Sequence, residues 1–345
     1  MEGGFCLVTQ DYTWLRQGKR AVVLLVGLAA CKGILPAEVR AESLVCVDKL
    51  GREVHIQVPL QKAVFLQLYE LIAALDIGDR VAAVGRHASD NDLLQAKDSL
   101  ALGSIPQVGT SNDINVEMLL KIRPDAVITW TYKREAIQFL EDKGLPVIGL
   151  APESLPELYD VLRLLGKLFA KENRAEKCIA EMEKILTLVK ERVSTIPVNA
   201  KRKVVWLMGK PTSVVCARGV SADLTTFIHA LNPAAAINQT TADISMERII
   251  SWNPDVIFIW GHAAYNVETV VSNSRWGSVT AVKERRVFKA PPWSTWSPRV
   301  APLVLWMAKK TYPELFCDVD VLRLCEEFYQ NVFGIPYHKV RGLDW

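Results

Sequence analysis

The chain has 345 residues, half of them hydrophobic, and a formal net charge of +3 at pH 7. This composition predicts a folded globular protein, and the length suits two domains better than a single core. The small net charge, without long basic runs, argues against nucleic acid as a partner.

The first 31 residues have the pattern of an export signal. Basic residues precede an apolar run over residues 21–30, which is too short to span a bilayer but suits the hydrophobic region of a signal peptide. The run leads into LAAC at residues 28–31, which resembles a lipoprotein signal. We expect an export signal over residues 1–31, lipidation at Cys31 and a tether over residues 32–43. Ordinary cleavage after residues 39–41 (VRA) and a buried cytosolic segment remain as alternatives.

From residue 44 to residue 150, short apolar strands alternate with helices. A hairpin is expected over residues 44–59, with its turn near Gly51. Further strands are predicted at residues 63–68, 80–85, 126–130 and 146–150, and helices at residues 69–78, 117–122 and 136–142. This alternation predicts a parallel sheet that is covered on both faces.

A long amphipathic helix is expected next. Between Glu172 and Ile196, apolar residues recur every three or four positions and charged residues occupy the other faces. The helix of about 24 residues would be on the order of 36 Å long. It could pack in the core of one domain, but its place between two similar halves favours a stiff connector.

The second half repeats the alternation. Strands are predicted at residues 203–209, 213–217, 256–260 and 286–291, helices at residues 224–232 and 247–252, and a helical tail from about Val300. Residues 117–130 (EMLLKIRPDAVITW) and 247–260 (ERIISWNPDVIFIW) share Glu, Pro, Asp and Trp at matching positions. The chain therefore consists of a lobe, a long helix and a second lobe, with one segment present in both lobes.

Five cysteines follow Cys31, and none has CxxC or metal-type spacing. Cys317 and Cys325 are eight residues apart in a predicted helix, a rise of about 12 Å at ~1.5 Å per residue, which is too long for a disulfide. We expect buried free thiols, although a long-range pair stays open.

This layout resembles the extracytoplasmic binding proteins of ABC importers that carry iron-siderophores, haem and vitamin B12. The resemblance covers about residues 44–337 and rests on four segments in the family's order, namely GREV, NVEMLLKIRPDAVITW, SMERIISWNPDVIFIW and WGSVTAVKERRVFKAP. It implies an α/β fold with two Rossmann-like lobes that contain parallel sheets, at residues 44–171 and 197–345, joined by a single long α-helix at residues 172–196. The ligand would be held in the cleft between the lobes.

The resemblance also implies a role for the repeated glutamate. In this family each lobe presents one surface glutamate, and the pair docks onto arginines of the two permease subunits. Glu117 and Glu247 match these positions. Charges at the rim of an interface set orientation and encounter rate more than affinity. The alternative is a glutamate favoured at a helix N-terminus by the helix dipole.

Candidate ligand-binding residues follow the strands and fill the proline-rich loop near residue 295. In open parallel sheets, ligands bind beyond the carboxyl ends of the strands. The candidates are aromatic or cationic: Tyr69, Arg86, His87, Trp130, Tyr132, Lys133, Arg218, Trp260, His262, Trp293, Trp296 and Arg299. Aromatic walls with a few cations suit a bulky, flat or anionic ligand such as a ferric siderophore. Taken singly, a tryptophan at a strand end could be a core residue and a loop arginine could be solvated.

No metal-binding or catalytic motif is present in the sequence. The histidines are scattered without HxH or HExxH, so capture of free zinc or manganese is disfavoured. His87 and His262 could instead face each other across the cleft and hold a haem or corrinoid metal. Neither a paired-carboxylate motif nor a nucleophile-base motif indicates an enzyme.

The leading hypothesis is a non-enzymatic binding protein that delivers an iron complex to the permease dimer of an ABC importer. It would be monomeric, need no cofactor, and act outside the cytoplasmic membrane on a lipid anchor. Alternative ligands are cobalamin, haem or an oxyanion such as molybdate. A chelatase-type enzyme on the same scaffold and the ligand-sensing domain of a receptor are the alternatives from other classes.

Overall fold

The computed structural model describes residues 42–345, except residues 111, 112 and 341 and the side chain of Ser99. The predicted export signal, Cys31 and nearly all of the tether lie outside the described residues. Within the described part of the chain, no helix is long and apolar enough to cross a membrane.

The described chain opens with the predicted hairpin. Strands β1 (Glu42–Val47) and β2 (Glu53–Val58) pair antiparallel, with Glu42 opposite Val58. The pairing begins two residues before the predicted start of the lobe. Gly51 takes a positive φ of 77° in the turn, a conformation in which glycine has no side chain to clash. Asp48 accepts hydrogen bonds from the backbone N–H groups of Leu50 and Arg52 and so fixes the turn.

The first lobe is built on a parallel sheet with strand order β4-β3-β5-β6. Its strands are β3 (Ala63–Phe65), β4 (Val81–Val84), β5 (Ala126–Trp130) and β6 (Val147–Leu150). The helices of this lobe are α1 (Glu70–Leu75), α2 (Asp92–Ala96), α3 (Val116–Ile122), α4 (Arg134–Asp142) and α5 (Leu155–Leu168). The strands are almost wholly buried, as expected for a parallel sheet that is covered on both faces.

Helix α5 is absent from the sequence-based predictions. Its N-terminus is capped by the side chain of Ser154, which accepts a hydrogen bond from the backbone N–H of Glu157. A serine followed three residues later by glutamate, in front of an apolar run, is a sequence signature of a helix start. That signal was available in the sequence.

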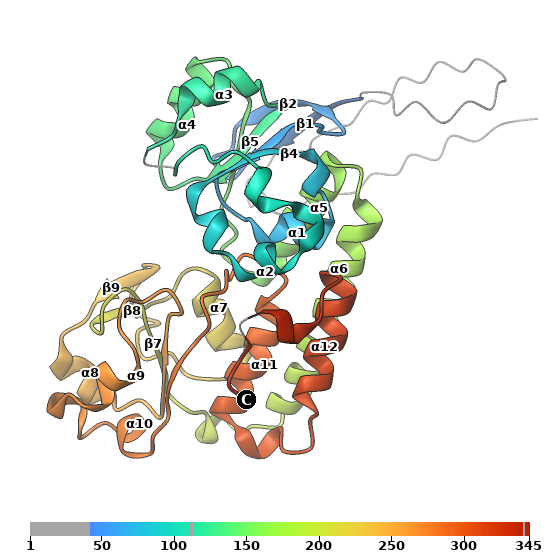
Figure 1. Cartoon of the computed structure of the whole chain (residues 1–345). Coiled ribbons are helices and arrows are strands. Elements are labelled where there is room, and N and C mark those ends of the chain that lie inside the picture. The colour runs from blue at the N-terminus through green and yellow to red at the C-terminus, as the bar shows by residue number, and fades with distance from the viewer. Residues whose placement is uncertain (1–41, 111–112, 341) are drawn as a thin grey trace, which may run out of the picture. The chain divides into compact units, whose positions relative to one another are not determined.

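Helix α6 (Glu172–Val193) runs between the two lobes (Figure 1). It packs against α1 and α5 of the first lobe and against α11 (Val300–Thr311) and α12 (Val321–Val332) of the second. Its apolar stripe, which includes Ala175, Met182 and Val189, is buried. The helix therefore connects the lobes and also belongs to their core.

The second lobe contains a mixed sheet with strand order β11-β10-β7-β8-β9. Strands β7 (Val204–Leu207), β10 (Val256–Ile259) and β11 (Val287–Lys289) are parallel, while β8 (Ser213–Val215) pairs antiparallel with both β7 and β9 (Thr241–Asp243). The remaining helices are α7 (Val220–Phe227), α8 (Met246–Trp252), α9 (Val267–Val271) and α10 (Thr280–Lys283). Two α/β lobes joined by one long helix confirm the predicted fold class. The antiparallel edge of this sheet differs from the wholly parallel sheet that was expected.

Short 3₁₀ helices connect these elements. They are η1 (Gly78–Arg80), η2 (Arg86–Asp90), η3 (Asp98–Leu100), η4 (Leu102–Ser104), η5 (Val198–Ala200), η6 (Ser274–Trp276), η7 (Pro313–Leu315) and η8 (Tyr337–Lys339). Of these, η2 follows strand β4 directly and carries His87 towards the sheet's carboxyl edge.

The repeated segment forms the same unit in both lobes. Helices α3 and α8 are capped at their N-termini by Asn115 and Ser245, and both end at a residue with positive φ, 51° at Arg123 and 46° at Asn253. A left-handed residue at this position ends a helix by satisfying its last carbonyl groups.

The repeated aspartates join each unit to the neighbouring strand. Asp125 Oδ2 accepts hydrogen bonds from the backbone N–H groups of Gln61 (2.7 Å) and Lys62 (2.8 Å), just before β3. Asp255 Oδ2 accepts one from Lys203 (2.7 Å), just before β7. The shared Asp therefore fixes the start of the adjacent strand in each lobe, and the following strand leads to Trp130 or Trp260.

The cysteines of the described chain are free. Cys46, Cys178, Cys216 and Cys325 are buried as predicted, and burial raises the pKa of Cys178 to about 11 and that of Cys325 to about 12. The prediction is wrong for Cys317, which is exposed because it lies in the turn before α12 and not in a helix.

Candidate ligand-binding cleft

A cleft of about 570 Å³ lies at the carboxyl ends of the strands of both lobes. Residues that follow β3, β5 and β6 line it from the first lobe, and residues that follow β7 and β10 line it from the second, together with the loop of residues 292–296. The sequence-predicted residues that line it are Tyr69, His87, Trp130, Tyr132, Arg218, Trp260, His262, Trp293 and Trp296.

Aromatic rings meet across one side of the cleft. The ring of Trp296, from the second lobe, lies 6.4 Å from that of Trp130 in an edge-to-face arrangement and 6.0 Å from that of Tyr132 in a stacked one. Trp130 and Tyr132 themselves are 5.6 Å apart. Tyr132 is exposed, so this cluster offers apolar ring surface to a ligand.

The two predicted histidines line the same cleft from different lobes. The ring of His262 lies 5.1 Å from that of Trp260 and is hydrogen-bonded to the backbone of Pro292. Loss of water against the cleft wall lowers the pKa of His262, and the nearby charge of His87 lowers it further. Asp90 Oδ2 lies 3.8 Å from His87 Nδ1. The neutral imidazole is therefore the favoured form of His262.

A cross-lobe ion pair lies at the rim of the cleft. Arg218, which follows β8, places Nη2 3.1 Å from Glu153 Oε1, which follows β6. Both side chains line the cleft and both are substantially exposed, at 53% and 39%. A partner ion or a polar ligand group can compete for Arg218 at this position.

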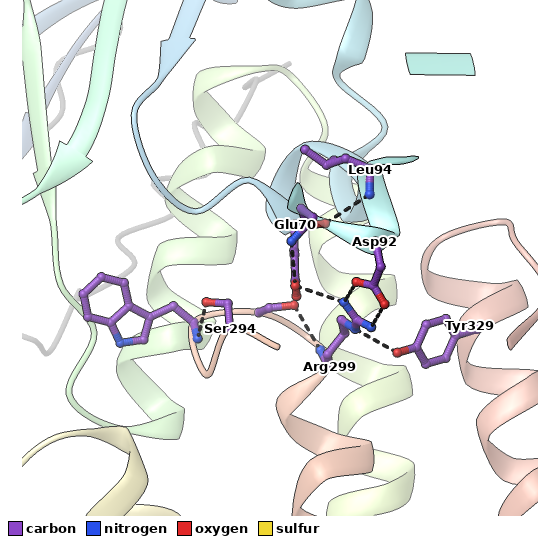
Figure 2. A network of polar contacts seen from close by, with 9 residues as sticks. Glu70, Asp92, Leu94, Ser294, Arg299 and Tyr329 are labelled. Atoms are coloured by element: carbon purple, nitrogen blue, oxygen red, sulfur yellow. Dashed lines mark hydrogen bonds and ion pairs between the residues drawn. The ribbon is translucent and has the colours of Figure 1, made fainter. Parts of the chain in front are cut away.

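The prediction that Arg299 lines the cleft is wrong. Its side chain is fully buried, with a relative exposure of 0%, and it binds Glu70 and Asp92 of the first lobe (Figure 2). Trp293 separates it from the cleft, with the guanidinium carbon 4.1 Å from the centre of the Trp293 ring. A buried charge needs paired partners, and the carboxylates of Glu70 and Asp92 supply them.

Two further candidates lie outside the cleft lining. Arg86 is exposed and its guanidinium forms an ion pair with Asp113. Lys133 is exposed at the position before α4, and its side chain caps no backbone group there. Both follow strands, as the strand-end rule requires, but neither lines the cleft.

Other residues of the lining were missed in the sequence. Met208 follows β7, and Pro152 and Glu153 follow β6, so the strand-end rule that nominated Trp130 would also have found them. Thr240 and Thr241 belong to the region of β9, a strand that the sequence did not predict.

The repeated glutamates lie away from the cleft lining, in the first turns of α3 and α8. Both are exposed, and Glu247 is paired with Arg275 at 3.0 Å. Hydrogen bonds from backbone N–H and from Ser245, together with the charge of Arg275, lower the pKa of Glu247. Among the described residues, no group of three or more His, Cys, Asp or Glu side chains could hold a metal ion.

The sequence profile of the periplasmic binding proteins matches residues 63–293, about two thirds of the chain. The chain belongs to the periplasmic binding protein family. The match begins at β3 and ends at Trp293, so it contains both repeated segments, α6 and most of the cleft lining.

Curated relatives bind chemically different substrates. The molybdate-binding protein MolA of Haemophilus influenzae is 25% identical over 326 residues, 85% of this chain and 92% of the relative. The Fe(3+)-citrate-binding protein YfmC of Bacillus subtilis is 26% identical over 269 residues, 74% of this chain and 80% of the relative. A vitamin B12-binding protein of Vibrio campbellii is 25% identical over 215 residues, 60% of this chain and 74% of the relative.

Solved structures have the same architecture. The CeuE protein of Helicobacter pylori, in complex with nickel and histidine, aligns with a TM-score of 0.77 at 25% identity over 86% of this chain and 98% of that protein. The molybdate-bound MolA structure aligns with a TM-score of 0.72 at 22% identity over 85% and 99% of the two chains. The second likeness supports the fold alone.

Family membership confirms the general functional prediction. Periplasmic binding proteins of this kind are substrate-binding components of ABC importers and are not enzymes. This chain therefore binds a small-molecule substrate outside the cytoplasmic membrane and has an importer permease as its partner.

Proposed function

We propose that the substrate is a metal ion already held by a small organic chelator, with a low-charge ferric siderophore as the leading example. The observation that carries this proposal is the character of the cleft, whose walls are aromatic and whose charged groups are paired with one another. The metal complex is cargo, and the protein needs no cofactor.

The charge pairing favours a ligand of low net charge. Glu153 is paired with Arg218 at the rim, and Glu70 is paired with the buried Arg299 behind the wall. His87 has Asp90 at 3.8 Å. A strongly anionic ligand would have to break one of these pairs or be buried without a counter-charge, and both are costly.

The size and the aromatic walls favour an organic chelate over a bare oxyanion. A volume of about 570 Å³ is in the middle of the range of roughly 300–1,000 Å³ that is usual for small-molecule sites. A compact anion such as molybdate would leave the ring faces of Trp130, Tyr132 and Trp296 without contact. Haem would fill the cleft more completely, but its flat ring requires a slot that these edge-to-face rings interrupt.

The two histidines add a means of binding the metal itself. A hydrogen bond to the backbone of Pro292 orients the His262 ring, which leaves its other nitrogen for a ligand, and metal-binding histidines are commonly held in this way. His87 stands on the other lobe. A chelator that leaves metal positions vacant could be completed by these imidazoles, and the related Helicobacter pylori CeuE has been solved as a nickel-histidine complex.

Calorimetric titration of the purified protein tests the proposal. We expect the tightest binding for neutral ferric hydroxamate complexes, weaker binding for ferric citrate and a trianionic ferric catecholate, and little for molybdate or cobalamin. Gallium(III) complexes of the same chelators are the matched control, because they keep charge and shape without iron's redox chemistry. Tighter binding of molybdate or cobalamin than of every ferric complex would contradict the proposal.

We further propose that residues 1–31 are an export signal, that Cys31 is lipidated and that the residues between Cys31 and β1 tether a monomeric binding protein to the membrane. Lobes at residues 44–171 and 197–345 would be joined by the helix at residues 172–196. Mass spectrometry of the native membrane fraction should find a diacylglyceryl group on Cys31. A soluble protein that begins at Glu42 would rule out the anchor.

A further inference from the structure

A buried ion cluster joins the two lobes behind the cleft. Arg299, immediately before α11 in the second lobe, has a side-chain exposure of 0%, while Glu70 of α1 and Asp92 of α2, both in the first lobe, have exposures of 1% and 13%. Arg299 Nη1 lies 3.1 Å from Glu70 Oε1 and 2.7 Å from Asp92 Oδ1, and Nη2 lies 3.0 Å from Asp92 Oδ2. Figure 2 shows these contacts converging on one guanidinium.

The cluster uses the geometry that is particular to arginine. Nη1 and Nη2 each donate a hydrogen bond to one oxygen of the Asp92 carboxylate, and Nε donates to the hydroxyl of Tyr329 of α12 at 2.8 Å. Burial lowers the pKa of Arg299, but the charge of Glu70 and the hydrogen bond to Asp92 outweigh it, so the net change is a raised pKa. A lysine has the charge but cannot make these directed contacts together.

Two residues of the cluster also form the cleft wall. Glu70 and Trp293 both line the cleft, and both contact the guanidinium of Arg299, Glu70 by an ion pair and Trp293 by its ring face at 4.1 Å. Glu70 is held in addition by the side-chain amide of Asn91 at 3.0 Å. One wall residue from each lobe is thus attached to the same buried cation.

We propose that Arg299 is a positioning residue for ligand binding, which sets the spacing between the two cleft walls by tying Glu70 and Asp92 to the N-terminus of α11. This role is separate from the identity of the ligand. It explains why a cation lies fully buried directly behind an aromatic wall, where a hydrophobic residue of similar volume would fill the space without the cost of removing a charge from water.

The competing explanation is that Arg299 only stabilises the fold. The Arg299→Lys variant distinguishes a positioning role from a purely stabilising one, with Arg192→Lys as the matched control. Arg192 also forms a two-nitrogen pair with a carboxylate, Asp318, at 2.7 and 2.8 Å, but that pair is largely exposed and joins α6 to the second lobe and not to the first. Asp92→Asn is the milder variant, because it removes one charge and keeps the shape of the side chain.

The first measurement is the distance between the lobes in the ligand-free protein. Spin labels are attached at Glu135→Cys on α4 and Glu268→Cys on α9, both exposed, in a Cys317→Ser background. We expect Arg299→Lys and Asp92→Asn to shift and broaden the distance distribution, and Arg192→Lys to leave it unchanged. The proposal would be overturned if Asp92→Asn and Arg299→Lys, where the latter folds, both gave the wild-type distance distribution.

The second measurement is the affinity for a neutral ferric hydroxamate complex, at a temperature where every variant is folded. We expect a loss of tenfold or more for Arg299→Lys, a smaller loss for Asp92→Asn and no loss for Arg192→Lys. If Arg299→Lys lowered thermal stability but kept the wild-type affinity and lobe distance, Arg299 would be a structural residue only. If the wild-type protein fails to bind this probe, the proposed substrate is wrong, and the lobe distance still decides the role of Arg299.

Discussion

Gly261 offers a direct test of whether the loop at residues 291–296 shapes the cleft. Gly261 lies between Trp260 and His262, and a Cβ atom added there would come within 2.0 Å of the carbonyl oxygen of Pro291 and 2.6 Å of the nitrogen of Pro292. Ordinary contact begins at 3.4 Å, so Gly261→Ala must displace this backbone by about 1.4 Å. The neighbour is main chain that cannot rotate away, unlike the end of a flexible side chain.

The expected loss of affinity follows from the rings that the loop carries. Trp296 makes two aromatic contacts with the first lobe, to Trp130 and Tyr132, and each such pair is worth roughly 0.5–1.5 kcal/mol. If both contacts are lost, we expect the free energy of ligand binding to weaken by about 1–3 kcal/mol, which is a loss of roughly 5- to 150-fold in affinity. Overpacking should lower the free energy of unfolding by a similar amount, about 1–3 kcal/mol.

Calorimetry with the ferric hydroxamate probe and urea unfolding measure the two effects. The control is Gly209→Ala, because Gly209 also follows a strand of the second lobe but an added Cβ would meet nothing within 4 Å. We expect the control to keep wild-type affinity. Wild-type affinity in Gly261→Ala, despite a measurable loss of stability, would show that the loop does not set the shape of the cleft.

Three further outcomes are expected. Trp130→Ala should weaken ligand binding by about 1–3 kcal/mol while the fold persists, and unchanged affinity with a large loss of stability would make Trp130 a core residue. Glu117→Ala and Glu247→Ala should leave ligand affinity nearly intact but slow uptake through the permease, more at low salt than at high salt, whereas Glu268→Ala, an exposed first-turn glutamate outside the repeat, should not. Because the pKa of His262 is lowered in the folded protein, its contribution to stability is present above pH 6.5 and is lost as the pH falls through the lowered pKa, so His262→Gln should flatten that part of the urea-unfolding profile.

The fold could largely be predicted because most strands are short apolar runs that are buried on both faces. Strand β9 was missed because Thr241, Ala242 and Asp243 are half-buried or exposed and carry no apolar pattern. Its pairing with β8 depends on contacts between residues far apart in the chain. Local composition cannot supply such a strand.

The site could be predicted only as far as the carboxyl ends of the strands. That rule found Trp130, Trp260 and His262 because the backbone alone brings them to the cleft. The direction of a long cationic side chain depends on its partners, and the partners of Arg299 lie 229 and 207 residues away in sequence. The sequence therefore could not show that this arginine is held behind the wall.

The hydrophobic core is continuous from one lobe to the other through α6. A single cluster of buried residues contains Phe65 and Phe169 of the first lobe, Met182 of α6, and Phe258 and Trp306 of the second lobe. Neither lobe can lose its packing without exposing apolar surface of the other. The protein should therefore melt in a single calorimetric transition, and either half expressed alone should aggregate or be degraded, although each contains a complete sheet.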